Sequence, residues 1–167
     1  MALSKIRDEE ELLRACEEYR DARLGFTNGC FDLLHVGHVR YLQEARAAVD
    51  ALIVAINSDA SVRALKGAGR PVAPAEQRAE VLAALECVDL VVIFADRTAE
   101  RLVALVQPDV YFKGADYSRE LNMPPEARVV EGYGGEVRFI KLTPGVSTTE
   151  LISRIRSGGL GAPRPVR

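Results

Sequence analysis

Short apolar runs alternate with amphipathic stretches along most of this chain. Each run is rich in Val and Ile and is bounded by polar residues, Gly or Pro, which is typical of buried strands. Both faces of the runs are apolar, so we expect layers that cover the strands on both sides. The runs predict strands at residues 22–28, 51–57, 89–94, 109–113 and 136–141.

The segments between these strands have the periodicity of helices. Apolar residues recur there at spacings of three and four, which places them on one face of a helix. The positions are Leu12, Leu13, Cys16 and Tyr19 before the first strand, Val39, Leu42, Ala45 and Val49 after it, Leu102, Leu105 and Val106 later, and Leu151, Ile152 and Ile155 near the end.

Strands separated by helices predict an α/β fold, a Rossmann-like doubly wound sheet of five parallel strands with helices on both faces. We expect an N-terminal helix over residues 1–21 packed on the domain, the domain itself over 22–156, and a flexible tail over 157–167. Ligands of such folds bind beyond the carboxyl ends of the strands. The residues that follow each strand are therefore the first candidates for a site.

Composition and charge limit the kinds of molecule that this chain is expected to bind. The chain has 167 residues, which suits one domain, and its 22 basic and 24 acidic residues leave a net charge of −2. That balance argues against binding to nucleic acid, and no apolar run approaches the ~20 residues of a membrane span. Three scattered cysteines without C-x-x-C spacing favour a reduced, cytoplasmic setting. We expect small-molecule partners, no nucleic acid and no membrane.

The loop after the first predicted strand carries the most distinctive chemistry. It holds two histidines, His35 and His38, three residues apart where a helix is expected to begin. This spacing puts both imidazoles on one face. The amides and dipole of a helix start favour an anion, and Gly29 and Gly37 would let the backbone approach it closely.

Other interpretations of this loop stay open. A histidine at a helix start can be a cap or a packing residue. Cys30, His35 and His38 are also zinc-ligand types, although no fourth ligand is evident. Asp32 could fix its own turn, orient a histidine or contact magnesium.

Two further segments offer groups for an anion. Ser147, Thr148 and Thr149 precede the last apolar helix, where they would serve as an N-cap and present hydroxyls and amides. Arg63, Lys66 and Arg70 are spaced so that a Gly-rich loop could bring three cations together, although exposed cations are commonly just solvated. Lys66 is the strongest of the three because a Lys-Gly loop can bind pyrophosphate.

The pattern Gly29, Phe31, Asp32, His35, Gly37 and His38 resembles the G-x-F-D-x-x-H-x-G-H signature of the H-x-G-H nucleotidylyltransferases, and Ser147-Thr148-Thr149 resembles their I-S-T-T-like element. Within that superfamily the chain is similar to the adenylyltransferase domains of bacterial ADP-heptose synthases. The similar stretches are residues 26–42, 53–63, 66–72, 78–85, 108–110, 113–117 and 147–149.

This resemblance implies transfer of AMP from ATP to D-glycero-β-D-manno-heptose 1-phosphate, with Mg²⁺ bound through the ATP phosphates and no metal site on the protein. It also implies a homo-oligomer. The residues it assigns are His35, His38 and Lys66 for catalysis, Asn28, Gly29, Cys30, Phe31, Gly37, Arg78, Gly114, Asp116, Ser147, Thr148 and Thr149 for the nucleotide, and Asn57, Asp59, Arg63 and Arg70 for the acceptor substrate.

Three alternative functions remain at this point. A cytidylyltransferase for glycerol 3-phosphate and an FMN adenylyltransferase would use the same chemistry on other substrates. A nucleotide-sensing module would bind ATP without turning it over.

Overall fold

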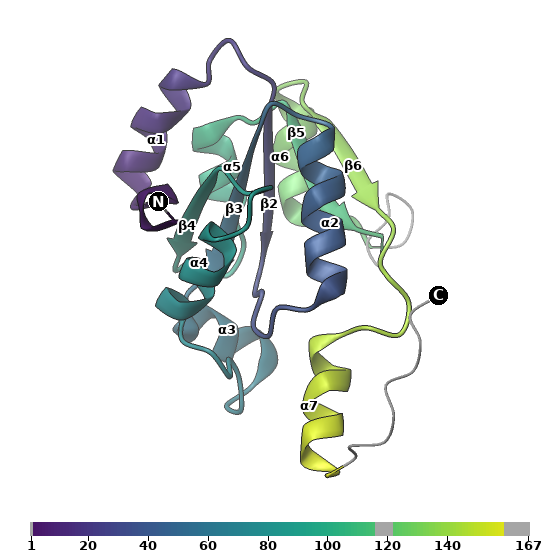
Figure 1. Cartoon of the computed structure of the whole chain (residues 1–167). Helices are drawn as coiled ribbons and strands as arrows, with labels where there is room; N and C mark the ends of the chain where they lie inside the picture. Colours follow the sequence, from purple (N-terminus) through teal and green to yellow (C-terminus); the bar gives the residue numbers. More distant parts are fainter. Residues whose placement is uncertain (1, 116–121, 159–167) are drawn as a thin grey trace.

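The computed structural model describes residues 2–115 and 122–158. These residues form one sheet of six parallel strands in the order β1-β4-β3-β2-β5-β6 (Figure 1). The strands are β1 (Ile6–Arg7), β2 (Leu24–Gly29), β3 (Ala51–Asn57), β4 (Leu90–Phe94), β5 (Val110–Gly114) and β6 (Glu136–Ile140). The helices are α1 (Glu9–Glu18), α2 (Val36–Ala47), α3 (Asp59–Lys66), α4 (Ala75–Ala83), α5 (Glu100–Val106), α6 (Pro125–Gly132) and α7 (Thr148–Arg156), preceded by a short 3-10 helix η1 (Ala2–Lys5).

The doubly wound α/β prediction is confirmed, and the five predicted strands agree with β2 to β6 within two residues at each end. The sheet has one strand more than predicted. That strand, β1, has two residues and pairs with β4 at the edge, with Ile6 opposite Val91. A two-residue strand is too short to show alternation, so the apolar pattern could not reveal it.

Two apolar cores lie on the two faces of the sheet. Along β3, Ala51, Ile53 and Ala55 point into one core and Leu52, Val54 and Ile56 into the other, and all six are 0% exposed. Helices α1, α5 and α6 pack on the first face, and α2 and α4 on the second. This double cover explains why the strands read as continuous apolar runs. No helix in residues 2–115 or 122–158 combines the length and apolarity needed to cross a membrane.

Strand β2 lies where the direction of winding reverses. The chain runs from β2 through β3 to β4, and then crosses back to place β5 on the other side of β2. The connections therefore diverge at the carboxyl end of β2 and leave a crevice there. Helices α3 and α7 both lie at this edge of the sheet, the lower edge in Figure 1.

The buried carboxylate of Asp32 holds the loop after β2 against the segment that follows α3. It accepts hydrogen bonds from the backbone amides of Val72 and Ala73 and pairs with the guanidinium of Arg70. Burial raises the pKa of Asp32, but the Ala73 amide, the Arg70 guanidinium and the Val72 amide outweigh it, so the pKa stays below its usual range. Asp32 neither closes its own turn nor bonds a histidine; it fastens two loops together.

Arg78 has a similar role beneath the crevice. Its guanidinium is 2% exposed and donates to the carbonyls of Ala73, Cys30 and Asn57 and to the carboxylate of Asp59. The guanidinium thus makes its hydrogen bonds with groups of the protein itself. Arg78 therefore ties the ends of β2 and β3 to α3 and α4, and its contact with the nucleotide, expected from the resemblance, stays a prediction.

Replacing Arg78 with Ala should lower the free energy of unfolding by about 3 kcal/mol, because three carbonyls and the Asp59 carboxylate would lose their donor. Urea unfolding measures this change. Arg63→Ala, at an exposed position on α3, is the control and should change stability by less than about 0.5 kcal/mol. Equal stability of the two variants would contradict the role given to Arg78.

Candidate active site

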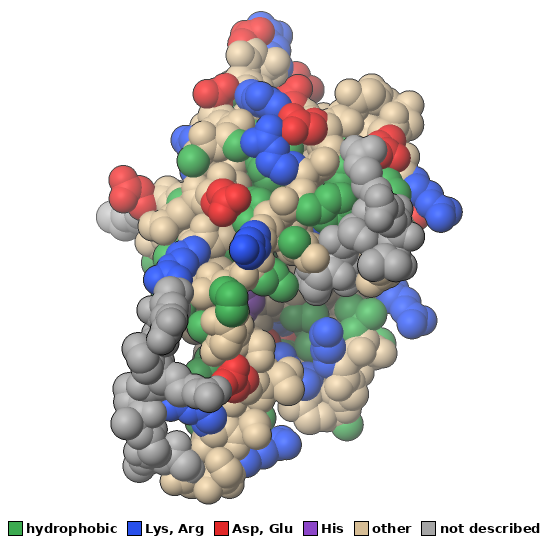
Figure 2. All heavy atoms as spheres, turned by 90° about the vertical axis from the view of Figure 1, so that its right-hand side faces the viewer, with side chains coloured by type: hydrophobic (Ala, Val, Ile, Leu, Met, Phe, Trp, Pro, Cys, Tyr) green, Lys and Arg blue, Asp and Glu red, His purple; other side chains and the backbone are tan. Residues whose placement is uncertain are grey.

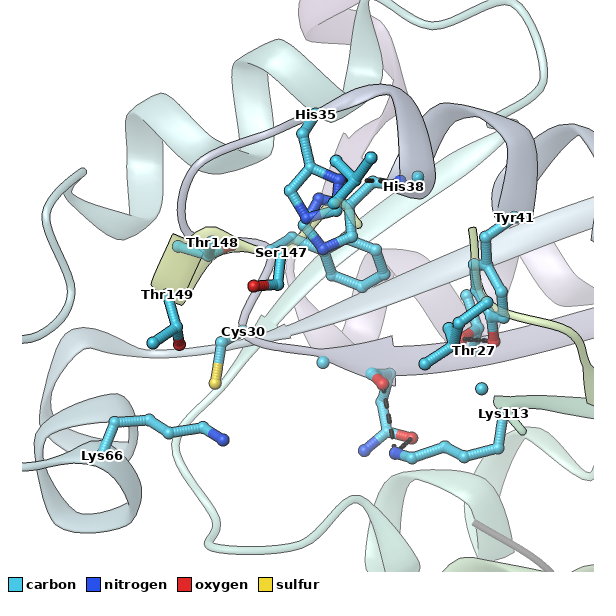
Figure 3. Close-up of a pocket in the computed structure, with 17 residues that line it drawn as sticks. Thr27, Cys30, His35, His38, Tyr41, Lys66, Lys113, Ser147, Thr148 and Thr149 are labelled. Carbon is cyan, nitrogen blue, oxygen red and sulfur yellow. Dashed lines mark hydrogen bonds between the residues drawn. The ribbon is translucent and has the colours of Figure 1, made fainter. Parts of the chain in front are cut away.

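A cavity of about 450 Å³ opens at the carboxyl end of β2. Its walls come from the loop after β2, the start of α2, the end of α3, the end of β5 and the start of α7 (Figure 3). The structure thus gathers segments that are far apart in the sequence. The predicted site residues that line it are Asn28, Gly29, Cys30, Phe31, His35, Gly37, His38, Lys66, Gly114, Ser147, Thr148 and Thr149.

The two histidines stack against each other in this cavity. His35 is the N-cap of α2, and its Nδ1 accepts a hydrogen bond from the backbone amide of His38 at 3.4 Å. The imidazole centroids are 3.8 Å apart with an angle of 19° between the rings. A Cβ at Gly37 would lie 3.0 Å from the His35 ring, so a glycine here leaves room for that imidazole. His35 is therefore both the N-cap of α2, as one interpretation of the sequence had it, and a residue of the site.

Burial keeps both imidazoles neutral near pH 7 when no ligand is present. It lowers the pKa of His35, and it lowers the pKa of His38 to about 4, with a smaller contribution from His35. The Nδ1 atom of His38 is buried and has no hydrogen-bond partner. On the face shown in Figure 2, histidine is visible only as a small area between uncharged side chains. An anion beside these rings would favour their protonation.

Aromatic packing sets the shape of the loop before the histidines. Phe31 has a φ of 43°, in the left-handed region that a bulky residue seldom adopts. Its ring lies 5.2 Å from that of His38, and a Cβ at Gly29 would meet the Phe31 ring at 3.1 Å. In this structure Gly29 and Gly37 make room for aromatic side chains of the loop itself, a constraint that the sequence did not indicate.

The start of α7 faces the same cavity. The Oγ of Ser147 accepts from the amide of Glu150 at 3.1 Å, so this residue is the N-cap. The hydroxyl of Thr148 donates to the carbonyl of Leu33 at 3.3 Å and connects α7 to the loop that carries the histidines. None of the described residues of α7 is buried. Its first turn therefore adds the positive end of a helix to the cavity.

Two lysines reach into the cavity from opposite sides (Figure 3). Lys66 is the last residue of α3. Lys113, on β5, donates from Nζ to the backbone carbonyl of Asn28 at 3.2 Å and to its side-chain oxygen at 3.1 Å. Lys113 was not among the sequence candidates. Its place at the end of a predicted strand was the available signal, because such positions border the crevice.

A second cavity of about 500 Å³ adjoins the first. The two share a wall that includes His38, Lys66 and Thr149. Beyond this wall the second cavity extends to Thr98, after β4, and to Glu126, at the start of α6. A ligand in each cavity would therefore meet at the shared wall.

The predicted acceptor-binding residues do not all converge. Arg63 and Asp59 line neither cavity, and Asp59 pairs with Arg78. Asn57 and Arg70 line the second cavity, where Asn57 donates to Ser61 at 3.0 Å and Arg70 is held by Asp32. Of the three cations expected to cluster, the structure brings Lys66 and Arg70 to one cavity and leaves Arg63 outside. Asp116, expected to contact the nucleotide, lies outside the described residues.

The zinc interpretation does not fit the geometry. The Cys30 sulfur points away from both imidazoles (Figure 3), and its hydrogen-bond partner is the side-chain oxygen of Asn57 at 4.0 Å. Burial raises the pKa of the Cys30 thiol, which opposes the thiolate that zinc requires. Throughout the part of the chain that the structure describes, no three His, Cys, Asp or Glu side chains gather closely enough to hold a metal ion.

Comparison with known proteins adds three kinds of relative. The family model described as cytidylyltransferase-like matches residues 26–154. A bifunctional protein HldE from Geotalea uraniireducens is 55% identical over 144 residues, which are 86% of this chain and 29% of that protein. Another from Bradyrhizobium sp. is 58% identical over 135 residues, 81% of this chain and 27% of that protein. The chain thus spans under a third of the length of these two relatives.

Solved structures agree on the fold. A lipopolysaccharide core biosynthesis protein from Thermoplasma volcanium is 25% identical with a TM-score of 0.58, covering 72% of this chain and 96% of that one. A pantoate-beta-alanine ligase from Francisella tularensis, 14% identical, has a TM-score of 0.60 over 81% of this chain and 66% of its own, a likeness of fold alone. With the family model matching residues 26–154 and the histidine cavity at the expected edge of the sheet, this chain belongs to the cytidylyltransferase-like family.

Proposed function

We propose that this chain is a nucleotidylyltransferase that transfers AMP from ATP to D-glycero-β-D-manno-heptose 1-phosphate and releases pyrophosphate. The observation that carries the proposal is the meeting of His35, His38, Lys66 and the start of α7 in one cavity that adjoins a second one. The resemblance to ADP-heptose synthases supports the acceptor, and a solved relative in lipopolysaccharide core biosynthesis is in line with it.

The reaction needs little covalent chemistry from the protein. An oxygen of the sugar phosphate attacks the α-phosphorus of ATP, a new P–O bond forms, and the bond to the β-phosphate oxygen breaks to release pyrophosphate. The nucleophile is already an anion, so no general base is required. Catalysis then depends on alignment and on stabilising charge in the transition state.

The two-cavity arrangement suggests where each substrate lies. ATP would occupy the first cavity, with its base between Gly114, Leu142 and Val146 and its phosphates toward the histidines. The acceptor would occupy the second cavity, with its phosphate at the shared wall. An in-line displacement would then require the acceptor oxygen to approach the α-phosphorus opposite the departing pyrophosphate.

The histidines, Lys66 and the start of α7 have distinct tasks in this scheme. His35 and His38 would donate hydrogen bonds to the α-phosphate and to the bridging oxygen. Lys66 and the first turn of α7, with Ser147 and Thr148, would hold the departing pyrophosphate. Neutral imidazoles can donate one N–H each, and the polyphosphate would favour their charged form as it binds.

Magnesium has no ligand set on the described part of the protein. Asp32, the carboxylate considered for it from the sequence, is used by Arg70 and two backbone amides, and no metal-binding group of side chains forms elsewhere in residues 2–115 or 122–158. The cation would enter on the triphosphate oxygens and neutralise part of their charge.

The substrates are tested by pyrophosphate release from every pairing of ATP or CTP with heptose 1-phosphate, glycerol 3-phosphate or FMN. We expect ATP with heptose 1-phosphate to give the highest kcat/KM. A faster reaction with CTP and glycerol 3-phosphate, or with FMN, would move the assignment to another acceptor. Nucleotide binding without product from any acceptor would favour a sensing module.

His38→Ala should lower kcat by about 100-fold or more, because a donor aimed at developing charge is lost. Stopped assays of AMP transfer measure kcat, and ATP binding by calorimetry shows that the site is still formed. Arg40→Ala, an exposed position on the same helix, should keep normal turnover. Near-normal turnover of His38→Ala would remove this histidine from the mechanism.

The depressed pKa of His38 also predicts how stability depends on pH. The unfolded histidine titrates near 6.5 and the folded one at about 4, so the unfolded chain binds more protons between these values. Stability from this residue is present above pH 6.5 and is lost as the pH falls toward 4. Between pH 6.5 and 4.5, wild type should lose about 2 kcal/mol more than His38→Gln in urea unfolding. Parallel curves for the two proteins would show that burial does not hold His38 neutral.

A further inference from the structure

The second cavity contains a buried carboxylate with one oxygen uncommitted. Glu126 is 3% exposed and is the second residue of α6. Its Oε1 accepts hydrogen bonds from the Nδ2 of Asn28 at 3.0 Å and from the backbone amide of Ala99 at 2.9 Å. No donor in the described part of the chain binds Oε2. In that part of the chain, His38 Nδ1 is the side-chain N or O atom that is both fully buried and without a hydrogen-bond partner. Oε2 also lacks a partner, so it is not fully buried. Oε2 is therefore accessible from the cavity that Glu126 lines.

Several contacts hold this carboxylate in place. Its two donors come from the end of β2 and from the loop after β4, and the first turn of α6 adds the positive end of a helix. Asn28 is itself fixed, because its side-chain oxygen accepts from the hydroxyl of Tyr111 at 2.7 Å and from Lys113. The position of Oε2 is thus set by a network that spans β2, β5, α5 and α6.

The chemistry of a fixed carboxylate oxygen limits what it can bind. It accepts hydrogen bonds, so it suits a hydroxyl or an amine and repels a phosphate. Glu126 belongs to the second cavity alone, whereas His38 and Lys66 lie on the wall shared with the first. A ligand that fits both features has a phosphate at one end and hydroxyl groups at the other.

We propose that Glu126 determines acceptor specificity, with its Oε2 accepting a hydrogen bond from a hydroxyl group of a sugar 1-phosphate whose phosphate lies at the shared wall. This inference rests on the proposed function and adds to it the residue that recognises the sugar. Glu126 then favours acceptors with hydroxyl groups over phosphate monoesters without them, because an unfilled carboxylate would lose its hydration without gaining a partner.

The test compares Glu126→Gln with wild type in AMP transfer from ATP to heptose 1-phosphate. The glutamine keeps an oxygen for Asn28 and Ala99 and replaces Oε2 with an amide that donates. We expect KM for the sugar phosphate to rise about tenfold or more, with KM for ATP and the melting temperature unchanged. Glu80→Gln makes the same charge change at an exposed position on α4 that lines neither cavity, and should match wild type.

A series of deoxy sugar 1-phosphates supplies a second measurement that needs no variant. On wild type, removal of one particular hydroxyl should raise KM about tenfold, and Glu126→Gln should no longer distinguish that analogue from the parent sugar. Equal KM values across the series on wild type would overturn the inference.

The outcomes separate the two claims. A wild-type protein that transfers AMP to no sugar 1-phosphate overturns the proposed function, and this inference with it. An active wild type with an unaltered KM in Glu126→Gln overturns the inference alone. Equal rises in KM for ATP and for the sugar phosphate, with a lower melting temperature, would make Glu126 a structural residue and also overturn it.

Discussion

The site depends on parallel pairing of β2 with a strand on each side. Because β3 and β5 both run parallel to β2, every loop that follows these strands emerges at one edge of the sheet. The chain winds outward in one direction as far as β4 and then in the other, so the loops after β2 and β5 separate and leave an opening between them. Segments from distant parts of the sequence meet there and carry the histidines, the lysines and a helix start. Their meeting depends on strand pairing and not on contacts between sequence neighbours. A change that broke this pairing would disperse the whole set.

Two residues that line this opening each have a polar side-chain atom without a hydrogen-bond partner in the part of the chain that the structure describes. The Nδ1 of His38 is buried without a partner, and the Oε2 of Glu126 has none among the described residues. By contrast, the buried carboxylate of Asp32 accepts from two backbone amides and Arg70, and the guanidinium of Arg78 donates to three carbonyls and to Asp59. An unpaired buried polar atom costs free energy, whereas a paired one stabilises the fold. Asp32 and Arg78 therefore shape the site, whereas the Oε2 of Glu126 can still accept a hydrogen bond from a ligand.

The sequence predicted the features that follow from local order. The apolar periodicity located β2 to β6, and the histidine spacing put both imidazoles at the start of α2, because helix geometry fixes neighbours three apart. It could not predict partners set by long-range packing. Arg78 was expected to contact the nucleotide, but the carbonyls that hold its guanidinium come from three segments that are separate in the sequence. Glu126 gave no signal, since glutamates are usually exposed, and it is buried by the packing of α6 against α5, β5 and β6.

The two-cavity arrangement separates the chemistry of transfer from the choice of acceptor. The shared wall includes His38 in the first turn of α2, Lys66 at the end of α3 and Thr149 in the first turn of α7. The part that belongs to the second cavity alone includes the loop after β4 and the start of α6, with Thr98 and Glu126. These segments connect different strands, so residues at the acceptor end can change while the histidines keep their positions. Sites on one fold diverge most readily in this way, because loop variation alters recognition without disturbing the core that aligns the reacting groups.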